Sequence, residues 1–258
     1  MNILVFLKQV PAKDASLRIT EDGQWVRESD IAFEVNEPDA FALEAGLQLK
    51  EKFGGEVVVV SLGPERVRQA IKEALAKGAD RAIHIQDEQF YTLEPLQVAA
   101  ALAGAVRGEK FDLLLTGLQS DDHGFGQTGV IVAELLSLPH ATIIMEIQVA
   151  DGRLRVKREL EAGWFQWVEM SLPAVLTIQS GINKPRYASL KGIMAAKKKE
   201  IRSLERGAVL PAASVATQKT KRIYVPEKTK KTEILPGTGK EAAVKLLEKL
   251  KHKARILS

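Results

Sequence analysis

The sequence TGLQSDDHGFGQTG, residues 116–129, joins two apolar runs at 111–115 and 130–136. We expect the first run to form a buried strand and the second to form a helix. A polar, glycine-rich loop between a buried strand and a helix is typical of the ligand-binding edge of a doubly wound sheet. Glycines allow backbone N–H groups to approach a ligand, and the N-terminus of the following helix favours an anion. The loop therefore predicts an anion site at the carboxyl end of a strand.

The N-terminal half of the chain alternates apolar runs with amphipathic segments. Strands are expected at 2–7, 56–62, 81–85 and 111–115, and helices at 39–52, 65–77, 93–107 and 130–136. The strands are continuous apolar runs, which is typical of strands buried on both faces. Repeated strand–helix units with short connections predict an α/β fold with a doubly wound, mostly parallel sheet covered by helices.

The pattern changes after about residue 140. Four strand-like segments follow, at 141–149, 154–160, 165–170 and 174–179. Asp151-Gly152, between the first two segments, is a hairpin signal. We therefore expect antiparallel strands to extend the parallel sheet, followed by a short helix within residues 189–201.

The C-terminal residues predict a separate part of the molecule. Residues 207–239 contain Pro211, Pro226 and Pro236 and show little periodicity, which indicates an extended arm. Residues 241–252 carry apolar side chains at helical spacing and predict an amphipathic helix. Such a long arm is unusual inside one compact domain. We expect an α/β domain at 1–205, and an arm with a terminal helix at 206–258 that docks on another subunit.

The composition excludes several classes of protein. The 258 residues include no cysteine, which excludes thiol catalysis, disulfides and cysteine-ligated metals. The sequence contains no apolar run of about 18 residues, so no membrane span is expected. It opens with a strand rather than with a basic and then apolar signal segment, so we expect a cytoplasmic protein.

The formal net charge is +4, and basic residues gather at 184–206 and 219–231. A solvated tail and a surface for an acidic partner both explain these clusters. Stacking aromatic residues are not interleaved with the basic ones, so nucleic-acid binding is not expected.

The sequence lacks the common catalytic signatures. It has no G-x-S-x-G elbow, no G-K-[ST] phosphate loop and no H-E-x-x-H. The histidines lie too far apart to suggest a metal site, and His123 in the loop is expected to be a polar surface residue. Gly124, Gly126 and Gly129 fit the dinucleotide pattern G-x-G-x-x-G only partly. We therefore predict no catalytic residue and no bound metal ion.

Two short acidic segments are candidates for ligand contacts. Asp121 and Asp122 are adjacent on a loop and are not expected to form a catalytic dyad, because such side chains rarely point at one atom. They could accept hydrogen bonds from a ribose or cap a helix beginning near Phe125. Asn36 and Asp39 offer the same two roles, as N-caps of the next helix or as nucleotide contacts, and both roles can hold at once.

Blocks at 4–11, 74–82, 157–163, 172–177 and 183–199 occur together, in order, over about residues 1–205. In sequence and spacing they resemble one family, the electron transfer flavoprotein beta subunit. Several matching blocks in order are far more specific than any single block. After Arg206, the chain matches the family only in the kind of segment that it contains.

The resemblance implies a Rossmann-like domain of the adenine nucleotide alpha hydrolase type. It also implies a heterodimer with an alpha subunit, whose C-terminal domain holds most of the redox-active FAD. In most of the family the beta subunit buries a structural AMP. By resemblance, the AMP contacts would be Phe6, Asn36, Glu37, Pro38, Asp39, Leu62, Gly117, Gln119, Ser120, Asp121, Asp122, Gly124, Gly126, Gln127 and Thr128.

A subset of the family binds a second FAD in place of AMP and bifurcates electrons from NADH. Gln127-Thr128-Gly129 resembles the AMP-binding members, whereas residues 120–124 match neither group closely. We therefore expect AMP, with a second FAD as the alternative.

Residues 183–200 resemble the recognition loop of the family, which inserts a leucine into an apolar pocket of a partner dehydrogenase. Leu190 occupies the position of that leucine, although it could instead pack on its own domain. The predicted docking residues are Tyr187, Leu190, Ile193, Met194 and Lys197.

The resemblance implies a protein that passes electrons from a flavin dehydrogenase, such as an acyl-CoA dehydrogenase, to a quinone-linked oxidoreductase. The cofactor supplies the redox chemistry in such a protein, and the beta subunit needs no bond-making residue of its own. A stand-alone protein that binds or hydrolyses ATP is an alternative of another class. The arm and helix after residue 207 argue against this alternative because they suit a partner.

Overall fold

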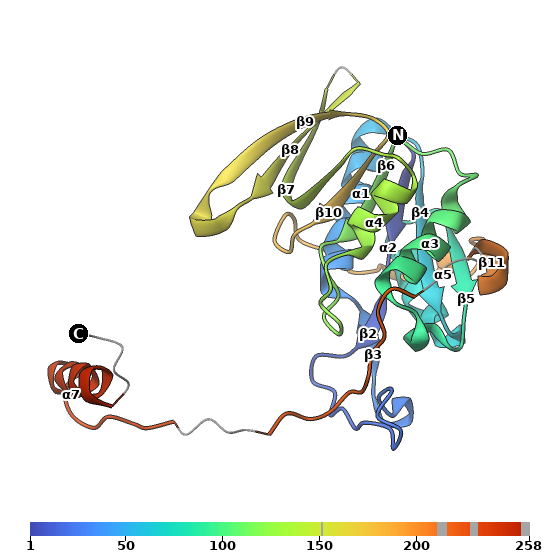
Figure 1. Cartoon of the computed structure of the whole chain (residues 1–258). Coiled ribbons are helices and arrows are strands. Elements are labelled where there is room, and N and C mark those ends of the chain that lie inside the picture. The colour runs from blue at the N-terminus through green and yellow to red at the C-terminus, as the bar shows by residue number, and fades with distance from the viewer. Residues whose placement is uncertain (151, 211–215, 228–231, 254–258) are drawn as a thin grey trace. The chain divides into compact units, whose positions relative to one another are not determined.

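The computed structural model describes residues 1–150, 152–210, 216–227 and 232–253 (Figure 1). Its contacts divide the chain into one unit at Met1–Ile223 and a second at Tyr224–Ser258. The largest sheet in the described residues has the order β11 (Ile201–Glu205), β5 (Arg81–Gln86), β4 (Val57–Gly63), β1 (Ile3–Phe6), β6 (Leu113–Gly117), β10 (Ala174–Ile178), β7 (His140–Ala150), β8 (Arg153–Glu159) and β9 (Phe165–Ser171).

Helices cover both faces of this sheet (Figure 1). On one face, α1 (Glu37–Phe53) and α2 (Arg68–Lys77) pack against a buried cluster that includes Ile3 and Val5. On the other face, α3 (Pro95–Val106) and α4 (Thr128–Leu135) pack against a cluster that includes Leu4 and Phe6. Successive residues of a strand point to opposite faces, so β1 alone supplies side chains to both clusters. The fold is therefore doubly wound and Rossmann-like, as predicted.

The chain changes direction across the sheet between β1 and β6. From β1 it proceeds to β4 and β5 on one side, and it then crosses to β6 on the other side of β1. Ile3 pairs with Leu113 and Val5 with Leu115, so the carboxyl ends of β1 and β6 are level. At such a switch point the flanking loops diverge and leave a crevice. The loop predicted to bind an anion begins here.

The predicted antiparallel extension is correct for only part of the region after residue 140. β8 pairs in antiparallel fashion with both β7 and β9. β10, however, is wrongly predicted as antiparallel, because it runs parallel between β6 and β7. All of its residues are buried, which suits a central strand covered on both faces. Tertiary contacts, which a local pattern does not contain, decide the partners of such a strand.

The helix predicted within residues 189–201 is shorter, and a strand follows it. The helix is α5 (Leu190–Ala196), and β11 then pairs in parallel with β5, with Arg202 opposite Ile83. The five residues of β11 carry two charges and only weak alternation. A strand this short and polar cannot be distinguished from a loop by periodicity.

Shorter elements complete the described chain. β2 (Gln9–Pro11) and β3 (Phe33–Val35) form a separate antiparallel pair, and α6 (Arg206–Val209) follows β11. In the second unit, α7 (Gly239–His252) confirms the predicted amphipathic helix, which begins with a capping box. Residues 216–227 and 232–238 contain neither helix nor strand. No helix in the described part of the chain is long and apolar enough to cross a membrane.

Candidate functional site

A cavity of about 140 Å³ opens at the switch point of the sheet. Residues at the carboxyl ends of β1, β4 and β6 line it, together with residues of α3 and of the first turn of α4. The predicted nucleotide contacts that line the cavity are Phe6, Asn36, Asp39, Leu62, Gly117, Gln119, Ser120, Gly126, Gln127 and Thr128. The predicted contacts outside this lining are Glu37, Pro38, Asp121, Asp122 and Gly124.

Asp39 joins the ends of β1 and β6 from the first turn of α1. Its Oδ2 accepts a hydrogen bond from the backbone N–H of Lys8 at 2.7 Å, and its Oδ1 accepts one from Gly117 at 2.8 Å. The side chain is buried. Burial raises the pKa of Asp39 to about 7, although the two backbone donors oppose this shift. Asp39 therefore fixes the floor of the cavity and does not cap α1.

Asn36 is the N-cap residue of α1, but its side chain does not cap the helix either. Its Nδ2 donates to the carbonyl of Gln119 at 3.0 Å, and its Oδ1 accepts from the backbone N–H of Asp121 at 2.9 Å. The capping hypothesis is thus wrong for both Asn36 and Asp39. Their side chains hold the glycine-rich loop against α1 instead.

The backbone of the loop approaches its neighbours very closely at Gly117. A Cβ atom at this position would lie 2.4 Å from Oδ1 of Asp39 and 2.7 Å from Cβ of Pro38. Gly124 and Gly126 both have φ near +63°, a conformation that L side chains rarely adopt. The glycines are therefore required by the geometry of the loop.

The loop ends at Gln127, which is the N-cap of α4 without a side-chain cap. α4 begins at Thr128, not near Phe125, so the hypothesis that Asp121 or Asp122 caps this helix is wrong. The N–H groups in the first turn of a helix have no partner within the helix. Because Thr128 and Gly129 line the cavity, this first turn borders the space where an anion would lie.

The two adjacent aspartates have different partners. Asp122 pairs with Nζ of Lys8 at 2.6 Å, whereas Asp121 accepts a 3.3 Å hydrogen bond from the backbone N–H of Glu37. Burial opposes ionisation of Asp122, but the charge and hydrogen bond of Lys8, together with His123 and Ser120, outweigh it, so the pKa of Asp122 is lowered. The two carboxylates therefore have separate partners, Lys8 and the backbone of Glu37.

The cavity also has an apolar wall that the sequence interpretation missed. Its residues come from the segment after β5 and from the start of α3, and they are Phe90, Leu93, Pro95, Val98 and Leu102. The available signal was positional, because this segment follows a parallel strand at the same carboxyl edge as the glycine-rich loop.

Three further lining residues lie on or beside the predicted segments: Lys8, His123 and Phe125. The ring of His123 lies 5.6 Å from that of Trp25, and Trp25 also contacts Phe90 edge-on at 5.5 Å. His123 is exposed, as predicted, and it also belongs to an aromatic cluster beside the cavity.

The predicted docking residues lie on a second surface. We call residues 187–197, which comprise Tyr187 and α5, the docking platform. Tyr187 is 93% exposed and Leu190 is 84% exposed, and Ile193, Met194 and Lys197 are also exposed. The alternative that Leu190 packs on its own domain is therefore wrong.

Part of the predicted basic cluster at 184–206 is structural. Arg186, Arg202 and Arg206 form ion pairs with the carboxylates of Glu44, Glu109 and Asp87 respectively. Lys191, Lys197 and Lys198 are exposed on or beside the docking platform. These exposed lysines, together with exposed Lys184, can face an acidic partner.

The fold and the position of the cavity define a Rossmann-like α/β protein of the doubly wound class. An electron transfer flavoprotein domain matches residues 24–209. The chain is 40% identical over 257 residues to electron transfer flavoprotein subunit beta of Methylophilus methylotrophus, which covers 96% of this chain and 97% of that protein. It is 34% identical over 259 residues to the corresponding subunit of Mus musculus, with 99% of each chain covered. The chain therefore belongs to the electron transfer flavoprotein beta-subunit family.

Proposed function

We propose that this chain pairs with an electron transfer flavoprotein alpha subunit and holds a structural AMP in the cavity at the switch point. The observation that carries the proposal is that one cavity is bordered by an apolar surface, by polar groups and by the N-terminus of a helix. Leu62, Phe90 and Val98 offer apolar surface for an adenine. Asn36, Asp39, Gln119 and Ser120 add polar groups that would face a ribose, and the first turn of α4 favours the phosphate. These residues fit an adenosine monophosphate.

The FAD of the heterodimer, held mostly by the alpha subunit, would supply the electron-transfer chemistry. The residues of this chain would bind the nucleotide and support the loop that contacts it. Asp39 and Asn36 hold the glycine-rich loop in place, and the loop in turn holds the nucleotide. The docking platform receives the electron donor, a flavin dehydrogenase such as an acyl-CoA dehydrogenase. The acceptor in this proposal is a quinone-linked oxidoreductase.

The nucleotide content of the purified heterodimer tests the proposal. Acid extraction and chromatography should release one FAD and one AMP per heterodimer. Recovery of two FAD molecules and no AMP would favour an NADH-dependent, electron-bifurcating protein. A well-behaved monomer that hydrolyses ATP, found on size-exclusion chromatography of this chain expressed alone, would contradict the proposal altogether.

Thr128→Val is expected to weaken AMP retention by about 1–2 kcal/mol, the scale of one lost hydrogen bond to a charged group. Thr128 is the first residue of α4 and lines the cavity, which supports the assignment of its hydroxyl to the phosphate. The measurement is the AMP-to-FAD ratio after extensive dialysis. Thr217→Val, an exposed position, is the matched control. Equal ratios in the two variants would remove Thr128 from the site.

Leu190→Ala is expected to lower kcat/KM for reduction by the dehydrogenase about tenfold, because an exposed apolar anchor contributes most of the energy of a small transient interface. The visible spectrum of the bound FAD should not change. Leu17→Ala, which truncates an exposed leucine outside the platform, is the control. Equal reduction kinetics for Leu190→Ala and the parent heterodimer would rule out an anchoring role.

A further inference from the structure

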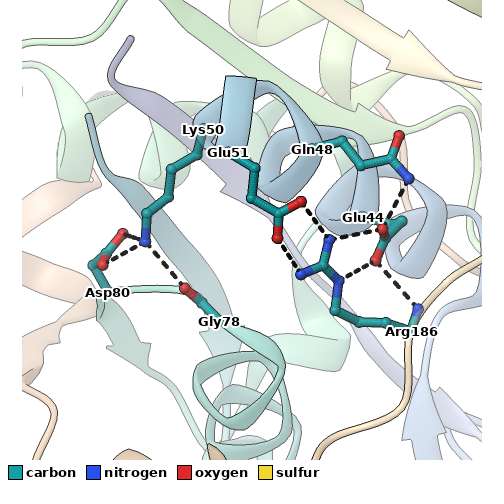
Figure 2. A network of polar contacts seen from close by, with 7 residues as sticks. All are labelled: Glu44, Gln48, Lys50, Glu51, Gly78, Asp80 and Arg186. Atoms are coloured by element: carbon teal, nitrogen blue, oxygen red, sulfur yellow. Dashed lines mark hydrogen bonds and ion pairs between the residues drawn. The ribbon is translucent and has the colours of Figure 1, made fainter. Parts of the chain in front are cut away.

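Arg186, the residue immediately before the docking platform, binds two carboxylates of α1 (Figure 2). Its Nε and Nη2 donate to the two oxygens of Glu44 at 2.8 and 3.0 Å. Its Nη1 and Nη2 donate to the two oxygens of Glu51. Glu44 and Glu51 are two helical turns apart, so they present their carboxylates on the same face of α1. The guanidinium therefore spans two turns of α1, from a buried carboxylate to an exposed one.

The contact with Glu44 is sheltered from solvent. The Glu44 side chain is only 6% exposed, and Nε2 of Gln48 donates to its Oε1 at 2.9 Å. The backbone N–H of Arg186 also donates to Glu44 at 3.2 Å. Burial opposes ionisation of Glu44, but the hydrogen bonds from Arg186 and Gln48 outweigh it and keep the pKa of Glu44 low. A planar, forked donor suits such a pair of carboxylates, and a lysine does not offer the same geometry.

The platform is attached to the domain at further points. Asn183 donates to the carbonyl of Phe41 in α1 at 3.0 Å. Gly192 lies so close to α2 that a Cβ would stand 2.1 Å from the carbonyl oxygen of Ala76. After the platform, Nζ of Lys199 donates to the carbonyls of Leu75 and Ala79. The exposed apolar side chains are thus carried by a backbone held on both sides.

We propose that Arg186 is a positioning residue for partner docking, and that its grip on Glu44 and Glu51 holds the platform in the conformation that the flavin dehydrogenase binds. The proposal rests on the function proposed above, and it assigns to Arg186 a role that acts through Tyr187 and Leu190. A surface that is already ordered loses less conformational entropy on binding. Exposed Lys191, Lys197 and Lys198 favour a partner whose apolar pocket has an acidic rim.

The experiment uses the FAD-loaded heterodimer with Arg186→Gln, Arg186→Lys and, as the matched control, Arg81→Gln. Arg81 also binds two carboxylates, those of Glu56 and Glu109, but at the start of β5. Hydrogen–deuterium exchange reports the order of residues 187–199. Steady-state reduction by an acyl-CoA dehydrogenase and its acyl-CoA substrate reports KM for the heterodimer and kcat separately.

Arg186→Gln should increase exchange in residues 187–199 and raise KM about tenfold, with kcat unchanged. Arg186→Lys should lie between the parent and Arg186→Gln in both measurements, and Arg81→Gln should match the parent in the platform. Unchanged exchange in Arg186→Gln would overturn the proposal. So would increased exchange with an unchanged KM. A parent heterodimer that takes no electrons from the dehydrogenase would contradict the proposed donor, and the exchange result would still decide whether Arg186 orders the platform.

Discussion

Replacing Gly117 with alanine is expected to destabilise the folded chain by about 3 kcal/mol and to release AMP from the heterodimer. The Cβ would stand 2.4 Å from Oδ1 of Asp39 and 2.8 Å from its backbone nitrogen, so β6 and α1 would have to separate. The hydrogen bond from Gly117 to Asp39 would be lost in the same movement. The nearest atom is Oδ1 of the buried Asp39 side chain, and Cβ of Pro38 and the backbone nitrogen of Asp39 stand close behind it, so rotation of one side chain cannot absorb the extra methyl group.

Thermal or denaturant unfolding of the heterodimer measures the first effect, and the AMP-to-FAD ratio measures the second. Gly108→Ala is the matched control, because its Cβ would meet no atom within 4 Å and its backbone does not have a positive φ. If Gly117→Ala were as stable as Gly108→Ala, the contact between α1 and β6 would be more compliant than the structure indicates. If it lost stability but kept AMP, the cavity would not be the nucleotide site.

Local pattern was sufficient to predict the frame of this fold. Buried strands such as Val57–Gly63 and Leu113–Gly117 can be recognised in the sequence because most of their residues are apolar. β10 and β11 show where such reasoning ends. β10 lies between β6 and β7, which are its hydrogen-bonding neighbours. The sequence of Ala174–Ile178 does not specify which strands these neighbours are.

The candidate site divides in the same way. The glycine-rich loop was predictable because its composition is unusual and its place after a strand is informative. Phe90, Leu93 and Val98 were missed, because apolar residues in or just before a helix usually indicate core, and only their place after a parallel strand pointed to the cavity. In the sequence, Arg186 is one member of a basic cluster and of the segment that resembles the recognition loop. Its proposed positioning role depends on Glu44 and Glu51, which face it from a distant part of the sequence.

One helix serves both surfaces. The first turn of α1 carries Asp39, which fixes the floor of the cavity, and later turns carry Glu44 and Glu51, which hold Arg186. Its axis is pressed against β1 and β6 through Gly46, whose Cβ would meet Val5 at 3.2 Å. If the cavity holds the AMP proposed above, a nucleotide that orders the loop around Asp39 would also order the helix that supports the docking platform. The proposed structural role of AMP would then have a physical basis.

Asp39 is expected to make the stability of the chain depend on pH near neutrality. Burial raises its pKa to about 7 from the ordinary value of 3.8. The folded chain thus binds this proton more tightly than the unfolded chain does. The contribution of Asp39 to stability is complete below about pH 4 and is lost as the pH rises through 7. The difference between the two pKa values corresponds to at most about 4 kcal/mol.

Asp39→Asn removes the titrating proton while keeping nearly the same shape, and it is compared with the parent by denaturant unfolding of the heterodimer between pH 5 and 8.5. Asparagine offers one acceptor to the two backbone donors of Lys8 and Gly117, so the variant should be less stable at every pH. The informative quantity is the difference in the free energy of unfolding between the parent and Asp39→Asn. This difference should become smaller as the pH rises. Asp14→Asn, at an exposed carboxylate, should show no such trend. A constant gap for Asp39→Asn would mean that the two backbone donors hold Asp39 ionised throughout this range, and that hydrogen bonding rather than burial governs its charge.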